Sequence, residues 1–153
     1  MGWWSSTIMG GDTPLDFEGS INDAVGLGYK PKASEIIKKL SEGQTKFING
    51  GIDDILNRWG CGKPDEEFYI DHKSIGFQVL AVMLMNEGIK INAELKAIML
   101  EWIPKDYWAK ENEERKKHVD NLLENLNNYD PSNPVDIHSE GLLEQISKLS
   151  KTK

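Results

Sequence analysis

The segment from Ile75 to Met85 constrains the fold more than any other part of the sequence, because almost every residue in it is apolar. Only Gly76 and Gln78 interrupt the run. A buried strand and a buried helix can both produce such a run. Leu, Ala, Met and Gln favour a helix, and Asn86-Glu87-Gly88 resembles a helix end. The sequence therefore predicts a central helix around which other helices pack.

Three further helices are predicted before this segment, each from apolar residues three and four positions apart. The first begins with Thr13 as N-cap, Pro14 at the first helical position and Asp16 in the first turn. A glycine closes each of the three helices. Their inward-facing residues are Phe17, Ile21, Ala24 and Val25; Ile36, Ile37 and Leu40, after a start at Ser34; and Ile52, Ile55, Leu56 and Trp59.

Three more helices are predicted after the central segment. Asn92 caps the first of them, and Pro104 ends it. The second, expected to be the longest in the chain, runs from Asp106 to Asn127. Residues 129–138 are predicted to form a connecting loop and residues 150–153 a frayed tail. The inward-facing residues are Leu95, Ile98, Met99 and Trp102; Val119, Leu122, Leu123 and Leu126; and, in a final helix, Leu142, Ile146 and Leu149.

These patterns predict an all-α protein in which residues 1–153 form a single compact helical domain. We expect about six to seven helices around the central apolar helix. A chain of 153 residues is long enough to bury a core without support from metals or disulfides. Cys61 is the one cysteine, which excludes an internal disulfide and fits a reducing compartment.

The charge balance is acidic, with 18 Lys and Arg against 25 Asp and Glu and a net charge of -7. Affinity for nucleic acid depends on cation density, so we expect no direct nucleic-acid binding. The longest uninterrupted apolar run, from Val79 to Met85, is too short to span a bilayer. The N-terminus lacks the basic start and apolar stretch of a signal peptide. We therefore expect a cytoplasmic protein that does not bind a membrane.

The N-terminal segment, residues 1–12, combines adjacent tryptophans with a glycine pair. Trp3 and Trp4 carry a large apolar area that can anchor a partner if it is exposed. The alternative is that at least one of the two indoles seals the helical core. Neighbouring side chains of an extended chain point to opposite sides, so one indole can be buried while the other is available. We take Trp3, Trp4, Asp12 and Asp16 as the candidate binding residues.

Asp71 and His72 form the principal candidate for a metal site, because they offer a carboxylate and an imidazole at adjacent positions. A metal phosphohydrolase on a helical scaffold typically has a His-Asp doublet with further ligands. Here the order is reversed, and the chain has only three histidines. The simpler interpretation makes Asp71 a helix cap, in competition with Ser74, and His72 a solvent-facing residue of the first turn. We expect no metal and no cofactor.

Motifs for nucleophilic or phosphate chemistry are weak in this sequence. There is no Gly-x-Ser-x-Gly elbow, and Cys61 follows a helix instead of preceding one. Gly10-Gly11-Asp12-Thr13 and Gly60-Cys61-Gly62-Lys63 resemble phosphate-binding loops only loosely. Both are interpreted as turns.

The opening residues resemble a known sequence family. Met1-Gly2-x-Trp4, followed by Gly11-Asp12-x-x-Leu15-Asp16, is similar to an uncharacterised bacterial and phage family. Its members typically begin Met-Gly-x-Trp-Gly, followed by an Asn-Asp pair and an Ala-x-Asp-Trp-like helix start. The composition also resembles that of a small early accessory protein of a T-even-type phage. The family has no established activity, so the resemblance implies no catalytic residue.

The function that the sequence predicts is binding rather than catalysis. We expect a small acidic cytoplasmic protein, phage-encoded and monomeric or homodimeric, that binds and modulates a host or phage protein. Two alternatives stay open. One is a small metal-dependent hydrolase that uses Asp71, His72, Asp12 or Asp16 around the metal. The other is a protein that sequesters a nucleotide in a helical pocket.

Overall fold

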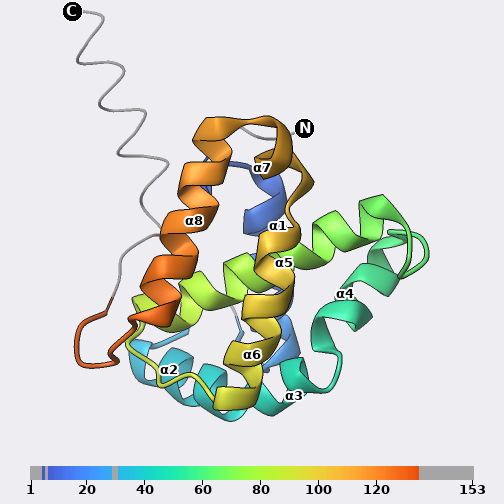
Figure 1. Ribbon diagram of the computed structural model, residues 1–153. Coiled ribbons are helices and arrows are strands. Elements are labelled where there is room, and N and C mark those ends of the chain that lie inside the picture. The colour runs from blue at the N-terminus through green and yellow to red at the C-terminus, as the bar shows by residue number, and fades with distance from the viewer. Residues whose placement is uncertain (1–4, 6, 29–30, 135–153) are drawn as a thin grey trace, which may run out of the picture.

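The central apolar segment belongs to a helix that is longer than the sequence predicts. In the computed structural model, which describes residues 5, 7–28 and 31–134, helix α5 spans Glu67–Asn86 and crosses the middle of the molecule (Figure 1). Every residue from Ser74 to Met85 is buried. A helix that is apolar on all sides has to be covered on all sides. The prediction of a central apolar helix is confirmed.

Eight α-helices and one short 3-10 helix, η1, form within the described residues, and no strand forms there. The predicted all-α fold class is confirmed. The short helix α3 was not predicted, and the predicted helix from Asp106 to Asn127 forms as two helices, α7 and α8. The bounds are α1 Asp12–Ala24, α2 Ala33–Glu42, α3 Gln44–Ile48, α4 Gly51–Trp59, α5 Glu67–Asn86, α6 Ala93–Trp102, η1 Ile103–Lys105, α7 Tyr107–Glu111 and α8 Glu113–Asn127.

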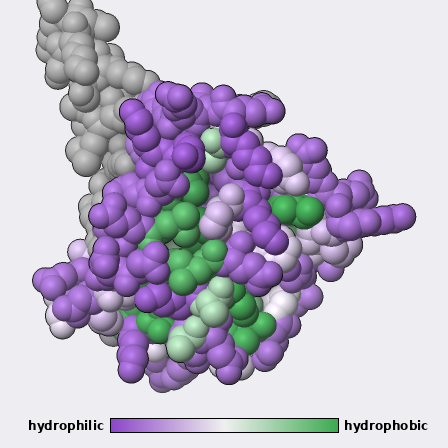
Figure 2. Space-filling view, in the orientation of Figure 1, coloured by the Kyte–Doolittle hydropathy of each residue, from purple (hydrophilic) through white to green (hydrophobic). Residues whose placement is uncertain are grey.

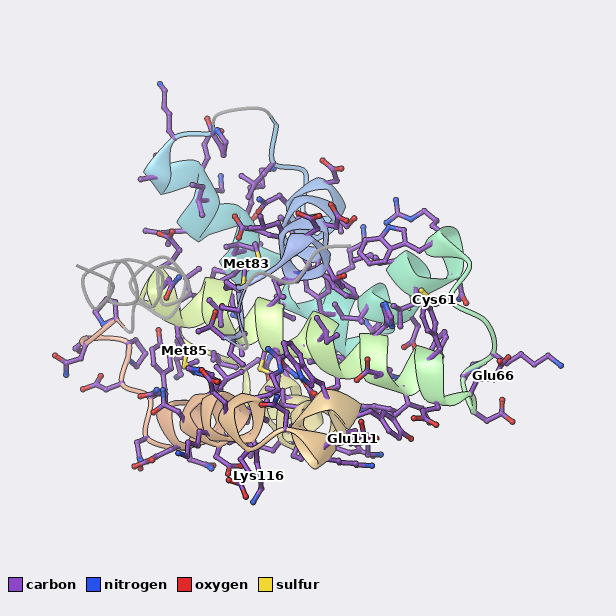
Figure 3. The ribbon with its side chains drawn as sticks, turned by 90° about the horizontal axis from the view of Figure 1, so that it is seen from above. Cys61, Glu66, Met83, Met85, Glu111 and Lys116 are labelled. Atoms are coloured by element: carbon purple, nitrogen blue, oxygen red, sulfur yellow. The ribbon has the colours of Figure 1, made fainter. Side chains whose placement is uncertain are left out.

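The other elements pack around α5. Helices α1, α4, α6 and α8 contact it, as does η1. Seen from above, α1 and α4 lie on one side of α5 and α8 lies on the other, with Met83 and Met85 projecting to opposite sides (Figure 3). Gly76 permits the close approach of α1 and α4. A Cβ at this position would lie 2.9 Å from Ile52 Cγ2 and 3.0 Å from Phe17 Cε1.

Most of the predicted inward-facing residues belong to the core. The buried ones are Phe17, Ile21, Leu40, Ile52, Ile55, Leu56, Leu95, Met99, Val119, Leu122 and Leu126. The half-buried ones are Ala24, Val25, Ile36, Ile98, Trp102 and Leu123. The prediction is wrong for Ile37 and Trp59, which are 44% and 38% exposed. Ile37 belongs to α2, which packs mainly against α3, and Trp59 is the last residue of α4.

The predicted cap of the first helix is also wrong. Helix α1 begins at Asp12, and Gly11 is its N-cap, with no side-chain capping bond. Thr13 is therefore the second helical residue, and Pro14 is the third. A proline is tolerated there because the first N–H groups of a helix have no partner within the helix.

The predicted long helix from Asp106 to Asn127 is divided at Asn112, whose backbone is extended. Each part has its own side-chain cap. Asp106 Oδ1 accepts a hydrogen bond of 2.9 Å from the N–H of Ala109, and Asn112 Oδ1 accepts one of 2.9 Å from the N–H of Arg115. Asp and Asn compete with helical hydrogen bonding in this way wherever a neighbouring N–H is unpaired. With 20 residues, α5 is the longest of the described helices.

The chain after α8 packs against the loop between α5 and α6. The Tyr129 hydroxyl donates a hydrogen bond of 2.9 Å to the carbonyl of Ile89. Gly88 has a φ of 68°, and a Cβ there would lie 3.1 Å from the carbonyl oxygen of Pro131. The predicted final helix with Leu142, Ile146 and Leu149, and the tail 150–153, lie outside the described residues. Among the helices that are described, none has the length and apolar character to cross a membrane.

Candidate functional site

Two of the four candidate binding residues can be placed. Trp3 and Trp4 lie outside the described residues. Asp12 is the first residue of α1, Asp16 follows one turn later, and both are exposed. The structure therefore brings the two aspartates to the same side of one helix.

Helix α1 has an apolar buried face and an acidic exposed face. Pro14, Phe17 and Ile21 are buried. Residues three, four, seven and eleven positions after Asp12 align with it on the opposite side of the helix. These exposed residues are Asp12, Leu15, Asp16, Gly19 and Asp23.

Helix α4 adds an aromatic side chain to this face. Trp59 ends α4, and Gly60 follows it in a left-handed conformation with a φ of 70°. The indole packs against the ring of Phe17, with centroids 4.6 Å apart, so Phe17 supports it from within. Leu15 and Trp59 are 41% and 38% exposed. Two large apolar side chains of adjacent helices are thus left uncovered at the same place.

Between these helices lies an open hollow of about 540 Å³, which we call the α1–α4 hollow. It is lined by Leu15, Asp16, Gly19, Ser20, Asp23 and Trp59. The charged residues among these are both acids. Within the described residues, neither Asp16 nor Asp23 forms a salt bridge. The α1–α4 hollow is therefore a mixed surface, in which two apolar side chains, Leu15 and Trp59, lie beside two carboxylates that no salt bridge among the described residues compensates.

Asp71 is not a cap of its own helix, which corrects the prediction. It lies in the second turn of α5, and its Oδ1 accepts a hydrogen bond of 2.9 Å from the N–H of Tyr107, the first residue of α7. Burial raises the pKa of the Asp71 carboxyl, with a smaller contribution in the same direction from Asp106. Asp71 thus stabilises the start of a helix that is distant in sequence.

His72 does not share a site with Asp71. Its Nδ1 is 2.9 Å from the carbonyl oxygen of Phe68, and its ring stacks on Phe68 with centroids 4.1 Å apart. Adjacent residues of a helix point about 100° apart. In the described part of the chain, no three side chains of His, Cys, Asp or Glu are grouped so that they could hold a metal ion.

The structure contains a buried polar network that sequence analysis missed. Arg115 is fully buried, and its guanidinium lies 2.8 Å from Asp106 Oδ2 through Nη2 and 3.1 Å through Nε. Nη1 donates a hydrogen bond of 2.9 Å to the carbonyl of Thr7, and Nη2 donates one of 2.8 Å to Gln78 Oε1. One cation thus joins the N-terminal segment, α5 and α8 to the residue that caps α7.

The network continues along α5. Gln78 Nε2 donates hydrogen bonds to Asp106 Oδ2 and Ser74 Oγ, and the Ser74 hydroxyl donates one of 2.8 Å to the carbonyl of Ile103. We call Thr7, Ser74, Gln78, Ile103, Asp106 and Arg115 the Arg115 network. Ser74 and Gln78 are four residues apart in the most apolar helix, so they share a face. That pair of polar residues is the one signal in the sequence that could have revealed the network.

The electrostatics of the Arg115 network indicate a structural role. Burial by itself would raise the pKa of Asp106, but the charge of Arg115 and the hydrogen bonds from Gln78, Arg115 and Ala109 outweigh it, so the pKa is lowered. Asp106 and Arg115 are 1% and 0% exposed. A cavity of about 290 Å³ adjoins them, also lined by Asp71, Ile75 and Trp108. Asp106 and Arg115 pair with each other and Asp71 accepts a hydrogen bond from the N–H of Tyr107, so the charged groups that line this cavity join elements of the fold.

A second hollow, of about 660 Å³, lies where α7 meets α8. Figure 2 shows a strip of apolar side chains framed by hydrophilic ones on this face of the molecule. The lining of the hollow includes Val119 and Leu123, and also charged residues of both signs, such as Glu111 and Lys116, which Figure 3 labels. None of the large apolar residues that are exposed lines it. The α1–α4 hollow is therefore the stronger candidate.

The loop after α4 is a turn, as predicted. Gly60 and Gly62 have φ values of 70° and 94°, which L-residues with a side chain rarely adopt. Cys61, between them, is buried, and burial raises the pKa of its thiol. Raising the thiol pKa lowers the thiolate population, so the site does not activate this cysteine.

Comparison with known protein families, with curated proteins and with solved structures finds no match to this chain. The class that the structure defines is an all-helical protein with a closed polar network inside and an acidic, partly aromatic hollow outside.

Proposed function

We propose that this protein is a small acidic modulator that binds a host or phage protein through the α1–α4 hollow and acts in the cytoplasm. One observation carries the proposal. Of the four large apolar side chains that are exposed in the described residues, Leu15 and Trp59 line the same hollow. An aromatic and an aliphatic side chain that remain uncovered together are typical of a surface that a partner buries.

The geometry favours a protein partner over the two alternatives. A hydrolase built on Asp71 and His72 needs both residues at one metal, but their side chains contact Tyr107 and Phe68 instead. A nucleotide in the α1–α4 hollow would bring its phosphates beside two carboxylates, Asp16 and Asp23, which repel them.

The experiment compares Leu15→Ser with Ile37→Ser, since the two side chains are similarly exposed, at 41% and 44%, and Ile37 lies outside the hollow. Tagged wild-type and variant proteins are used to capture partners from a bacterial host lysate. Leu15→Ser is expected to weaken binding of the principal partner about thirtyfold, in line with loss of an interface hot spot. Ile37→Ser is expected to retain it.

Thermal unfolding of both variants provides the control for folding. Each substitution changes an exposed side chain, so each is expected to alter stability by about 0.5 kcal/mol or less. Equal capture of the same partner by wild type and Leu15→Ser would contradict the proposed site.

A further inference from the structure

Gly19 lies in the middle of α1 without an evident reason within the chain. It is exposed, and a Cβ added there would meet no atom within 4 Å. Its φ lies outside the left-handed range in which glycine is favoured. Glycine is less favourable than alanine inside a helix because it loses more conformational freedom. The packing of the described residues therefore does not require glycine at this position.

The position of Gly19 suggests that it allows a partner to approach α1 closely. It lines the α1–α4 hollow together with Ser20, Leu15 and Trp59. A glycine in this position keeps the floor of the hollow low and lets another backbone or a bulky side chain approach α1 closely. An apolar group of a partner can then contact both the leucine and the indole.

The charge on this face restricts the kind of partner. Asp12, Asp16 and Asp23 all lie on the exposed face of α1, which extends for about 17 Å between the first and the last of them. No lysine or arginine lines the hollow. A second copy packed through the same face would place aspartates against aspartates. Anionic lipid headgroups and nucleic-acid phosphates are disfavoured for the same reason.

We infer that the α1–α4 hollow binds a basic amphipathic helix of the partner protein. Apolar side chains of that helix lie between Leu15 and Trp59, its backbone passes close to Gly19, and its Lys or Arg residues face Asp16 and Asp23. This inference rests on the proposed function and specifies the partner's chemistry. Helices commonly bind in grooves through apolar residues at spacings of three and four, with charges at the rim.

The test uses three fluorescently labelled peptides of about 14 residues, long enough to match the exposed face of α1. The first has Leu and Lys at amphipathic helical spacing, the second replaces Lys with Glu, and the third is a scramble of the first. Binding is measured by fluorescence anisotropy at low and high salt. The first peptide alone is expected to bind, with an affinity that falls as salt is raised.

Variants then place the binding on α1. Gly19→Gln fills the hollow with a good helix former, so it is expected to weaken binding about tenfold while the melting temperature stays equal or rises. The matched control is Ala97→Gln on α6, where alanine is also small and exposed. It is expected to bind as the wild type does. Asp16→Lys combined with Asp23→Lys is expected to abolish binding.

The outcomes separate this inference from the proposed function. Equal binding of the scrambled peptide, absence of binding by the first peptide, or unchanged binding by Gly19→Gln overturns the inference. If Leu15→Ser still loses the captured partner in that case, the proposed function stands with a partner of different chemistry. If Leu15→Ser keeps its partner, the site itself is wrong.

Discussion

The Arg115 network and the α1–α4 hollow depart in opposite ways from the usual distribution of polar and apolar residues. In the network, a charged pair lies where water cannot reach it, and each charge has hydrogen-bonding partners from the chain. In the hollow, Leu15 and Trp59 are exposed, and the part of the chain that the structure describes leaves them uncovered. A buried polar group without a hydrogen-bonding partner destabilises the folded state, so Asp106 and Arg115 are both fully hydrogen-bonded. An exposed apolar side chain destabilises the folded state less than an unpaired buried polar group does, and a partner can bury it on binding.

The largest expected effect comes from breaking the network. Arg115→Met removes the cation and leaves the Asp106 carboxylate buried beside Gln78, so the free energy of unfolding is expected to fall by about 3–5 kcal/mol. Urea denaturation followed by circular dichroism measures it. Arg58→Met, which removes an exposed arginine from α4, is the matched control and is expected to change stability by about 0.5 kcal/mol or less.

A double variant sharpens this result. Asp106→Asn added to Arg115→Met removes the uncompensated charge and keeps an oxygen that can accept from the N–H of Ala109. The double variant is expected to recover part of the free energy of unfolding that Arg115→Met loses. A loss below about 1 kcal/mol for Arg115→Met alone would contradict the view that the pair is fully desolvated.

Two glycine-to-alanine substitutions are expected to act with opposite signs. Gly76→Ala places a methyl group 2.9 Å from Ile52 Cγ2 and 3.0 Å from Phe17 Cε1, closer than packed carbon atoms normally lie, so overpacking is expected to cost about 1–3 kcal/mol. Gly19→Ala meets no neighbour in the α1–α4 hollow and is expected to raise stability by up to about 1 kcal/mol through helix propensity. Urea denaturation of both variants checks the signs. A stability loss in Gly19→Ala would show that the hollow is already filled.

The smallest expected effect concerns Asp71, a carboxylate near the network that has no salt bridge among the described residues. Burial raises its pKa, so its charged form is less favourable in the folded than in the unfolded state. Its contribution therefore becomes less favourable as the pH rises from the unfolded value of about 3.9. Asp71→Asn is expected to unfold at the same temperature as wild type below that pH and at a slightly higher one at pH 7. A lower melting temperature at pH 7 would contradict this.

The helical periodicity predicted the core better than it predicted the helix ends. Phe17, Ile52 and Met99 are buried where the spacing places them, because packing of an apolar stripe decides which way a helix faces. Trp59 has the same spacing and is exposed, since a residue at the end of a helix has fewer neighbours to cover it. The break at Asn112 depends on a side-chain cap, which a run of charged residues concealed.

The candidate site was predictable only in part. Asp16 was identified from its position at a helix start, but its grouping with Trp59 depends on how α1 and α4 cross α5. The Arg115 network could not be predicted for the same reason, because Arg115 lies in a run of charged residues, Lys110 to Lys117, of the kind that usually faces solvent. The spacing of residues in the sequence shows which side of one helix is buried. It does not show which helices meet, and both the α1–α4 hollow and the Arg115 network are formed by several elements.

The bond from Arg115 to the carbonyl of Thr7 joins residues 108 positions apart. During synthesis, Thr7 is added 108 residues before Arg115, so the segment around Thr7 lacks this hydrogen bond until α8 has been made. A contact between residues so far apart in sequence forms late in folding, after the intervening helices have assembled. The segment around Thr7 is thus secured late, and a nascent chain stalled before α8 would leave this segment accessible to proteases and chaperones.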